Sequence, residues 1–249
     1  MKNFLSLVLV LVLGSLIIVS LNNNELFGDY GDANVGQRVS GYFIERNVNG
    51  STQAVEFGES VDLESGPANI VTAIVADYRS FDTLGEITVL FVSSLGVAML
   101  LATPRAKRMK LDFHPNFMLR VGSRALFGII LMTGVYIIIH GHLTPGGGFP
   151  GGAMIASSIL LLYLADDKFR AKVTGFKVLE SISGSLYIII GLIGLFFFDY
   201  FLVNFLDNGV LGELFSSGII PIIYILIGLK VGSEISGIID HFLTEEGVS

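Results

Sequence analysis

Residues 125–165 form a run of 41 residues without a single Asp, Glu, Lys or Arg. A helix crosses a bilayer core with about 20 mostly apolar residues, so this run is long enough for two membrane spans. Composition agrees, because 15% of the residues are charged where a soluble domain has about 25%, and the mean hydropathy is +0.71. We therefore predict an all-α integral membrane protein.

Further uncharged runs bring the expected number of transmembrane helices to about six. These spans are predicted at residues 4–21, 84–103, 120–140, 150–165, 178–198 and 216–238. The first span follows Lys2 and is similar to a signal peptide, but no small-residue cleavage site comes after it. A retained anchor is therefore favoured over a cleaved signal, and both interpretations stay open.

The positions of the basic residues predict the orientation of the spans. With the N-terminus inside and six alternating spans, 12 Lys and Arg fall on the inner side and three on the outer side. Because cytoplasmic loops retain positive charge, we expect a multi-pass protein of the cell inner (plasma) membrane with both termini in the cytoplasm.

Composition also excludes several classes of function. The chain has 22 Asp and Glu against 15 Lys and Arg, a net charge of −7, whereas nucleic-acid binding needs clustered basic residues. The absence of cysteine excludes disulfides, thiolate metal sites, Fe–S clusters and a Cys nucleophile. No nucleophile–base pair is apparent either, so we expect no enzyme activity, no metal and no cofactor.

One long polar segment, residues 22–67, is expected outside the membrane. Residues 39–45 and 52–57 alternate apolar and polar side chains, and Asn49-Gly50 between them is a turn signal. This pattern predicts a small extracytoplasmic β-hairpin after the first span.

The first group of candidate ion-path residues lies in NIVTAIVADYRSFDTLGE, residues 69–86. Apolar residues at helical spacing predict a surface-lying helix at 68–82. Asp77, Arg79 and Asp82 interrupt its apolar pattern just before the next span. Charges at this place are expected to face the boundary between lipid and water.

Asp82 and Glu86 lie four residues apart, on one face of a helix, where like charges repel. One carboxyl should therefore take a proton, bind a cation or pair with Arg79. Such a pair is typical of the outer mouth of a cation path. In the structural alternative, Thr83 caps the span. Arg79 then pairs with Asp77 or Asp82.

A turn rich in glycine and proline, HGHLTPGGGFPGG at residues 140–152, follows the third span. Its centre consists of Pro145, Gly146, Gly147, Gly148 and Phe149. These residues extend a helix poorly, so we predict a compact turn between broken helices, covered by protein or lining water. His140 could relay protons there, since its reference pKa is about 6.5. A purely structural turn is the alternative, and two nearby histidines alone make a poor metal site.

Lys230 falls near the middle of the last predicted span, four residues before Glu234. A charged group at that depth costs about 2.5–3.5 kcal/mol on insertion scales, which makes it a candidate functional residue. An ion pair with Glu234 and snorkelling of Lys230 to the interface are the structural alternatives. Glu180, at the inner start of the fifth span, is expected at the membrane interface.

Two longer motifs resemble known membrane proteins. NIVTAIVADYRSFDTLGEITVLF, residues 69–91, resembles the C-terminal tail of the large A-type component of Mrp-type multisubunit Na+/H+ antiporters, and the matching small component of membrane-bound hydrogenases that carry an Mrp module. GHLTPGGGFPGGAMIASSILLLYLA, residues 141–165, resembles the B-type component of the same antiporters, the MnhB domain. The resemblance implies a fusion of an A-tail-like half (1–104), a basic cytoplasmic linker (105–119) and a B-like four-helix half (120–243).

The resemblance further implies a non-catalytic subunit of a complex that exchanges Na+ for H+. Its partners would be the lipid bilayer and other Mrp-type subunits, both the large A/D-type and the small C, E, F and G-type. The family's acidic DTLGE position maps to Asp82 and Glu86, its PGGGF turn to Phe149, and a Lys of the last B-type helix to Lys230. A second function stays open, a structural assembly subunit of a membrane-bound hydrogenase or complex I-like respiratory complex without an ion path of its own.

Overall fold

The computed structural model describes residues 2–22, 39–52, 54–101, 107–108, 115–166, 169 and 171–245. Its elements are α1 (Lys2–Asn22), α2 (Val39–Ile44), α3 (Ile70–Thr72), the π-helix η3 (Ala73–Tyr78), α4 (Ser80–Leu101), β1 (Lys107–Arg108), α5 (Phe117–Ile139), α6 (Gly148–Ala165), α7 (Val173–Phe198), α8 (Ile220–Phe242) and β2 (Thr244–Glu245). Residues 1–43 form one compact unit and residues 44–249 the other. Most of the predicted basic linker, 105–119, lies outside the described residues.

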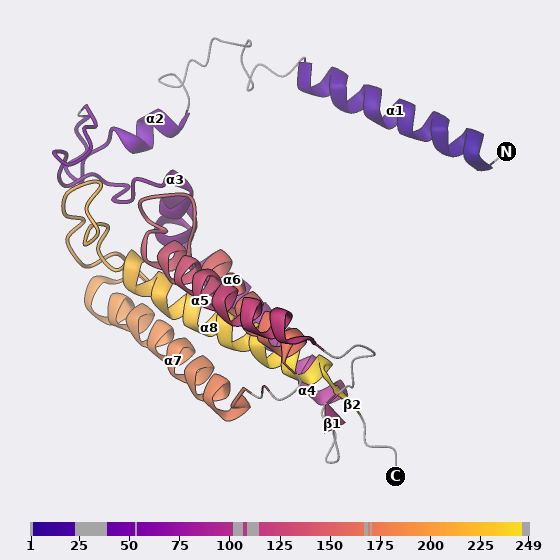
Figure 1. Cartoon of the computed structure of the whole chain (residues 1–249). Helices are drawn as coiled ribbons and strands as arrows, with labels where there is room; N and C mark the ends of the chain where they lie inside the picture. The colour runs from indigo at the N-terminus through magenta and orange to yellow at the C-terminus, as the bar shows by residue number, and fades with distance from the viewer. Residues whose placement is uncertain are drawn as a thin grey trace. The chain divides into compact units, whose positions relative to one another are not determined.

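Five helices, α4 to α8, are long and apolar enough to cross a membrane, and all belong to the second unit (Figure 1). The expectation of a helical, multi-pass membrane protein is therefore confirmed. In α1 the described apolar stretch, Ser6–Val19, is shorter than a membrane span. The sixth span, and hence the predicted count of six, stays a prediction.

Helix α8 is the centre of the bundle. It contacts α4, α5, α6 and α7, and in Figure 1 it lies between α7 on one side and α5 and α6 on the other. In the most apolar part of α8, 61% of the residues are buried within the chain, against 6% in α4. In lipid, apolar helices have no hydrophobic driving force to associate. Close packing therefore has to hold α8 in place. Helix α4 instead presents most of its apolar surface outward.

Glycines let α6 and α8 approach through their backbones. A Cβ atom added at Gly152 would lie 2.8 Å from the carbonyl oxygen of Gly228 and 2.9 Å from the amide nitrogen of Gly232. A Cβ atom at Gly148 would lie 2.6 Å from Cβ of Ile227. Small residues at such positions are typical of membrane helix contacts. The contact explains why α6 tolerates so many glycines in its first turns.

The predicted β-hairpin is wrong in its first strand, because Val39–Ile44 forms helix α2. The turn itself exists, since the amide of Asn47 donates to the carbonyl of Ser51 at 2.8 Å. Only isolated bridges accompany it, Arg46 with Thr52 and Asn47 with Leu63. Five or six alternating residues do not distinguish strand from helix unless a partner strand is present. In this segment the described residues supply no continuous ladder.

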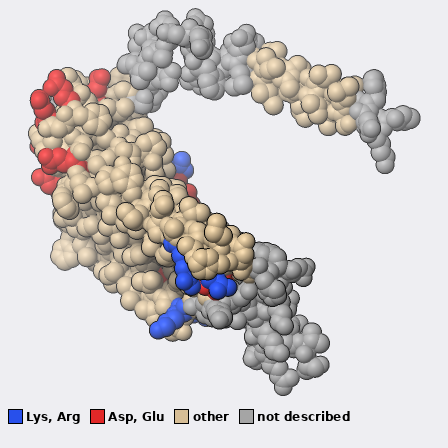
Figure 2. All heavy atoms as spheres, in the orientation of Figure 1, with Lys and Arg blue, Asp and Glu red and all other residues tan. Residues whose placement is uncertain are grey.

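Charged side chains gather at the two ends of the helical bundle. Figure 2 shows Asp and Glu at the end formed by residues 45–82 and 199–213, here called the acidic end. Lys and Arg gather at the opposite end, here called the basic end, where the described basic residues are Arg120, Arg124, Lys172 and Lys177. Uncharged surface separates the two, as expected where lipid surrounds the bundle. At the basic end β1 pairs with β2 antiparallel.

Candidate functional site

Helices α4 and α7 both pack against α8 and enclose two adjoining cavities of about 270 and 320 Å³. We call this space the α4–α7 groove. Both cavities are lined by Phe91, Glu180 and Ser181. The first extends toward His241 and the basic end, and the second reaches Lys230 and the start of α4 at Leu84. This mostly apolar groove carries a few polar side chains and has room for water or a small ion.

Lys230, which lines the second cavity, forms an ion pair with the buried Glu234. The Lys230 ammonium lies 2.5 Å from Oε1 of Glu234, and the two side chains are 10% and 0% exposed. The ammonium also lies 5.0 Å from the ring centroid of Phe91, a distance at which the aromatic face attracts a cation. Within the described residues, Oε2 of Glu234 has no hydrogen-bond partner. Half of the Glu234 carboxylate is therefore buried without compensation.

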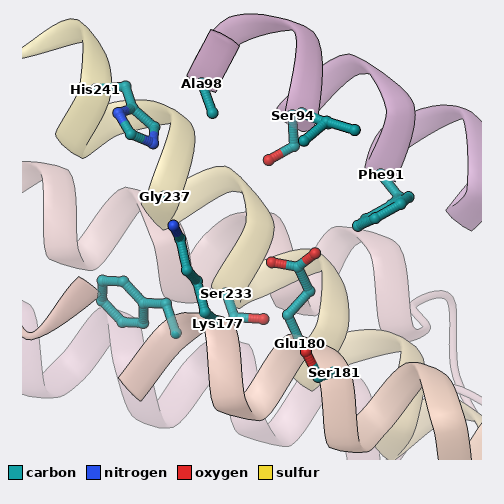
Figure 3. A pocket seen from close by; sticks show the side chains of 11 residues that line it. Phe91, Ser94, Ala98, Lys177, Glu180, Ser181, Ser233, Gly237 and His241 are labelled. Carbon is teal, nitrogen blue, oxygen red and sulfur yellow. The ribbon is translucent and has the colours of Figure 1, made fainter. Parts of the chain in front are cut away.

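Glu180 projects into the same groove, and its expected position at the membrane interface stays a prediction. Figure 3 shows its carboxylate in the space between α4 and α7, with Ser181 beside it and Ser233 of α8 nearby. Lys177 and His241 line the same cavity. Sequence reasoning missed this placement because it depends on which helices pack against α8. Spacing along α7 alone does not contain that information.

Asp82 and Arg79 lie at the acidic end of the bundle rather than in the groove. Nη2 of Arg79 contacts Oδ2 of Asp82 at 2.5 Å, and the side chains are 68% and 51% exposed. Glu86 is also exposed, on the same helix. The predicted helix cap at Thr83 is wrong, since α4 already begins at Ser80 and the Thr83 hydroxyl donates to the Val75 carbonyl at 2.6 Å.

The predicted surface helix before α4 is largely a π-helix. Helix α3 continues into η3, and Arg79 separates η3 from α4. Asp77 on η3 is half-buried, and burial together with the nearby Glu64 carboxylate raises its pKa to about 6. Tyr78 donates a hydrogen bond to Glu64 at 3.3 Å. Asp77 is therefore poised between its charged and neutral forms near neutral pH.

The glycine-rich segment after α5 forms a compact turn. His140 ends α5, and its ring stacks on Tyr136 with centroids 4.1 Å apart. Gly147 adopts a φ of 135°, which favours glycine, and α6 begins at Gly148. Phe149 packs against the hydrophobic core, while Pro145 is exposed. His140 thus lies at the acidic end and does not line the two cavities of the groove.

A buried network that sequence reasoning missed ties this turn to α3 and α8. The Thr72 hydroxyl donates to the Gly141 carbonyl at 2.7 Å and accepts a hydrogen bond from Tyr224 at 2.9 Å. His142 is fully buried, and neither ring nitrogen has a hydrogen-bond partner among the described residues. Burial lowers the pKa of His142 below 6.5, opposed by the backbone of Glu213 and Leu214. The ring is therefore held neutral.

No group of three His, Asp or Glu side chains converges as a metal site within the residues that the structure describes. The groove instead offers one carboxylate, Glu180, together with serine and threonine hydroxyls, the His241 ring and the ammonium groups of Lys177 and Lys230. Such a set is able to exchange protons and to bind a partly hydrated monovalent ion.

Comparison with known proteins identifies the family. Residues 118–237 match the model of a domain related to the MnhB subunit of Na+/H+ antiporter, and residues 33–113 match that of the MBH component MbhE. The chain is 36% identical over 104 residues to the B component of the Na(+)/H(+) antiporter of Alkalihalophilus pseudofirmus, covering 39% of this chain and 72% of the relative. This chain belongs to the MnhB family. Both resemblances predicted from its motifs are confirmed.

Two longer proteins are also similar to this MnhB-family chain. It is 30% identical over 200 residues to an uncharacterized protein of Methanocaldococcus jannaschii, covering 68% of this chain and 74% of that protein. It is also 30% identical over 154 residues to the A/B component of a probable K(+)/H(+) antiporter of Rhizobium meliloti, covering 52% of this chain but only 15% of that one.

Two solved structures contain chains similar to this MnhB-family chain. One is the membrane-bound sulfane sulfur reductase, an archaeal respiratory membrane complex, with 43% identity, a TM-score of 0.75, and coverage of 98% of this chain and 99% of the other. The second is the Mrp complex from Dietzia sp. DQ12-45-1b, with 27% identity, a TM-score of 0.59, and coverage of 75% and 22%. The chain is therefore an MnhB-type membrane subunit of an antiporter-like complex.

Proposed function

We propose that this chain is a non-catalytic membrane subunit of a monovalent cation (Na+)/proton antiporter module, and that the α4–α7 groove is part of its ion path. The observation that carries the proposal is the buried Lys230–Glu234 pair, whose lysine lines the second cavity of the groove. The names of relatives support it, since these include the B component of an Na(+)/H(+) antiporter and the A/B component of a probable K(+)/H(+) antiporter.

Burying Lys230 and Glu234 away from water costs desolvation free energy. Two charges removed from water recover that cost only when their remaining hydrogen-bonding groups are satisfied, and apolar residues would often be as stable. In this chain Oε2 of Glu234 is not satisfied within the described residues. Lys230 meanwhile reaches a cavity. When Lys230 gives up its proton, the groove becomes more negative and attracts a cation, which links proton movement to cation movement.

An antiporter role also implies partners for this chain and an orientation in the membrane. Other Mrp-type subunits, the large A/D-type and the small C, E, F and G-type, would cover the outward apolar face of α4 and close the groove against lipid. The acidic end would face outward and the basic end the cytoplasm, following the positive-inside rule. Asp82 and Glu86 would then lie at the outer surface, where cations are attracted before they enter the path.

A second function is favoured by one observation. The chain matches a chain of the membrane-bound sulfane sulfur reductase over 98% of its own length. In that role this protein would be an assembly subunit of a respiratory complex without an ion path of its own. The Lys230–Glu234 pair would then only hold α8 in register with its neighbours.

Replacing Lys230 distinguishes the two functions. Lys230→Met in the assembled complex should reduce cation-dependent dissipation of a pH gradient in everted vesicles at least tenfold, because the exchangeable proton is lost. Lys172→Met, at an exposed position before α7, is the matched control and should leave transport unchanged. Assembly is checked by co-purification of the other subunits. Normal transport in an assembled Lys230→Met complex would leave only the assembly role.

A further inference from the structure

Glu180 belongs to Thr174–Phe198 of α7, a stretch long and apolar enough to cross a membrane. It is the eighth residue of a helix that begins at Val173, and seven steps of about 1.5 Å place it roughly 10 Å from that start. Its residue is only partly exposed, and it lines both cavities of the α4–α7 groove. It thus stands at the junction of the cavity toward the basic end and the cavity toward Lys230. An ionisable residue at such a place is a candidate functional residue by default.

The Glu180 carboxyl has no partner in the described part of the chain. No ion pair or hydrogen bond is formed by its side-chain oxygens there, although Lys177 lies three residues before it on the same helix. Lys230 is already paired with Glu234. An unpaired carboxylate away from bulk water is unfavourable. Whatever occupies the two cavities, a proton, a cation or water, therefore has to stabilise it.

The surroundings of Glu180 suit a hard cation, which prefers oxygen ligands. Serine and threonine hydroxyls come from all three helices of the groove, namely Thr88 and Ser94 of α4, Ser181 of α7 and Ser233 of α8. Thr88 and Ser233 donate their protons to backbone carbonyls of their own helices. Their oxygens keep lone pairs that can accept or coordinate. The groove thus offers several neutral oxygen atoms around one carboxylate.

Charged side chains face Glu180 from α7 and α8, and both lysines of the lining, Lys177 and Lys230, are positive. Helix α8 contributes Lys230, positive, and Glu234, negative, and Glu234 and Glu180 repel each other. Helix α4 contributes no titratable side chain to the lining. Lys177 and His241 stand toward the basic end. Because Glu180 forms no ion pair with either lysine among the described residues, a proton or a monovalent cation can bind its carboxylate, and the two compete for it.

We propose that Glu180 is the carboxylate that binds the transported monovalent cation and the proton in alternation, at the junction of the two cavities of the α4–α7 groove. This inference rests on the proposed antiporter function and adds the binding residue to it. Because a proton and a cation cannot both be held at one carboxylate, their exchange at Glu180 couples the two movements. The charges of Lys230 and Glu234 then influence how strongly Glu180 binds the cation or the proton.

Chemical labelling tests cation binding at Glu180 without relying on transport. Dicyclohexylcarbodiimide modifies protonated carboxyls in apolar surroundings, and mass spectrometry of the assembled complex reports the modification at Glu180. Added NaCl or KCl should reduce this modification at least fivefold relative to choline chloride at equal ionic strength. Protection should weaken as the pH falls, because protons then displace the cation. Equal modification in all three salts would overturn the inference.

Transport by Glu180 variants provides the second test. Glu180→Gln should lower antiport at least tenfold, and Glu180→Asp should retain transport with a changed half-saturating cation concentration. Glu59→Gln, an exposed position at the acidic end, is the control and should behave as the native chain. If Glu180→Gln fails to assemble, protection of the native Glu180 by NaCl or KCl still supports the inference, and its absence still overturns it.

The two proposals fail in different ways. Normal transport by Glu180→Gln together with loss of transport by Lys230→Met would overturn the role of Glu180 and leave the antiporter function standing. Normal transport by both variants in assembled complexes would overturn both proposals. Loss of transport by both, with cation protection of Glu180, is the result expected here.

Discussion

Two titratable residues outside the spans, Asp77 and His142, are held where charge is disfavoured. Asp77 lies half-buried on η3 beside Glu64, and burial raises its pKa to about 6. His142 is fully buried in the turn before α6, and its pKa is lowered. Both residues belong to the layer that covers the acidic end of the bundle. The packing of this layer should therefore depend on pH.

The pH dependence contributed by Asp77 has a definite sign. Its pKa rises from 3.8 to about 6 on folding, so the stability it contributes is fully present below pH 3.8 and is lost as the pH rises through about 6. Asp77→Asn removes the charge and should raise the thermal midpoint at pH 8 with little effect at pH 4. Circular dichroism melts of the chain in detergent measure this, with the exposed Asp62→Asn as control. An equal gain at both pH values would contradict the assignment.

At the scale of whole elements, α8 depends on the glycines of its neighbour α6. The approach at Gly152 is between backbone atoms, which cannot move aside as a flexible side chain can. Helix α5, by contrast, has glycines such as Gly128 with open space around the Cβ position. Identical substitutions should thus have opposite consequences in the two helices.

Gly152→Ala should destabilise the chain by about 1–3 kcal/mol, because the added methyl group forces α6 and α8 apart. For a chain of this size, each kcal/mol corresponds to a fall of about 2–4 °C in the thermal midpoint. Gly128→Ala should leave the midpoint unchanged or slightly higher, since alanine favours helix. Thermal melts of both variants in the same detergent provide the comparison. Equal midpoints would show that the α6–α8 contact is looser than the structure indicates.

The helices were predictable and the groove was not. Uncharged runs located α4 to α8 to within a few residues, because a lipid-facing helix must be apolar along its length. The strand prediction for residues 39–44 was wrong, since a six-residue alternation is compatible with helix or strand. Lys230 could be singled out from its depth alone. The place of Glu180 could not, because it follows from α4 and α7 sharing α8 as a floor.

At the scale of the whole molecule, the segregation of charge between the two ends of the bundle predicts its orientation. The basic residues Arg120, Arg124, Lys172 and Lys177 should remain in the cytoplasm, while the acidic layer at residues 45–82 should be exposed on the other side. The chain contains no cysteine, so a single introduced cysteine reports its own location without background.

Ser51→Cys at the acidic end should react with a membrane-impermeant maleimide in intact cells. Lys172→Cys at the basic end should react only after the membrane is permeabilised. The native chain serves as the unlabelled control. The reverse pattern would show that the basic end faces outward and would contradict the predicted topology.

The spacing of Lys230 and Glu234 also matters during synthesis of the chain. Because the two residues are four apart on one helix, they meet as soon as that turn of α8 has formed, before any other helix arrives. A nascent segment whose charges cancel internally enters lipid more readily than one carrying a bare ammonium. We therefore expect the last span to leave the translocon without help from other helices. Its charged residues would then already be inside the bilayer when the neighbouring helices pack against it.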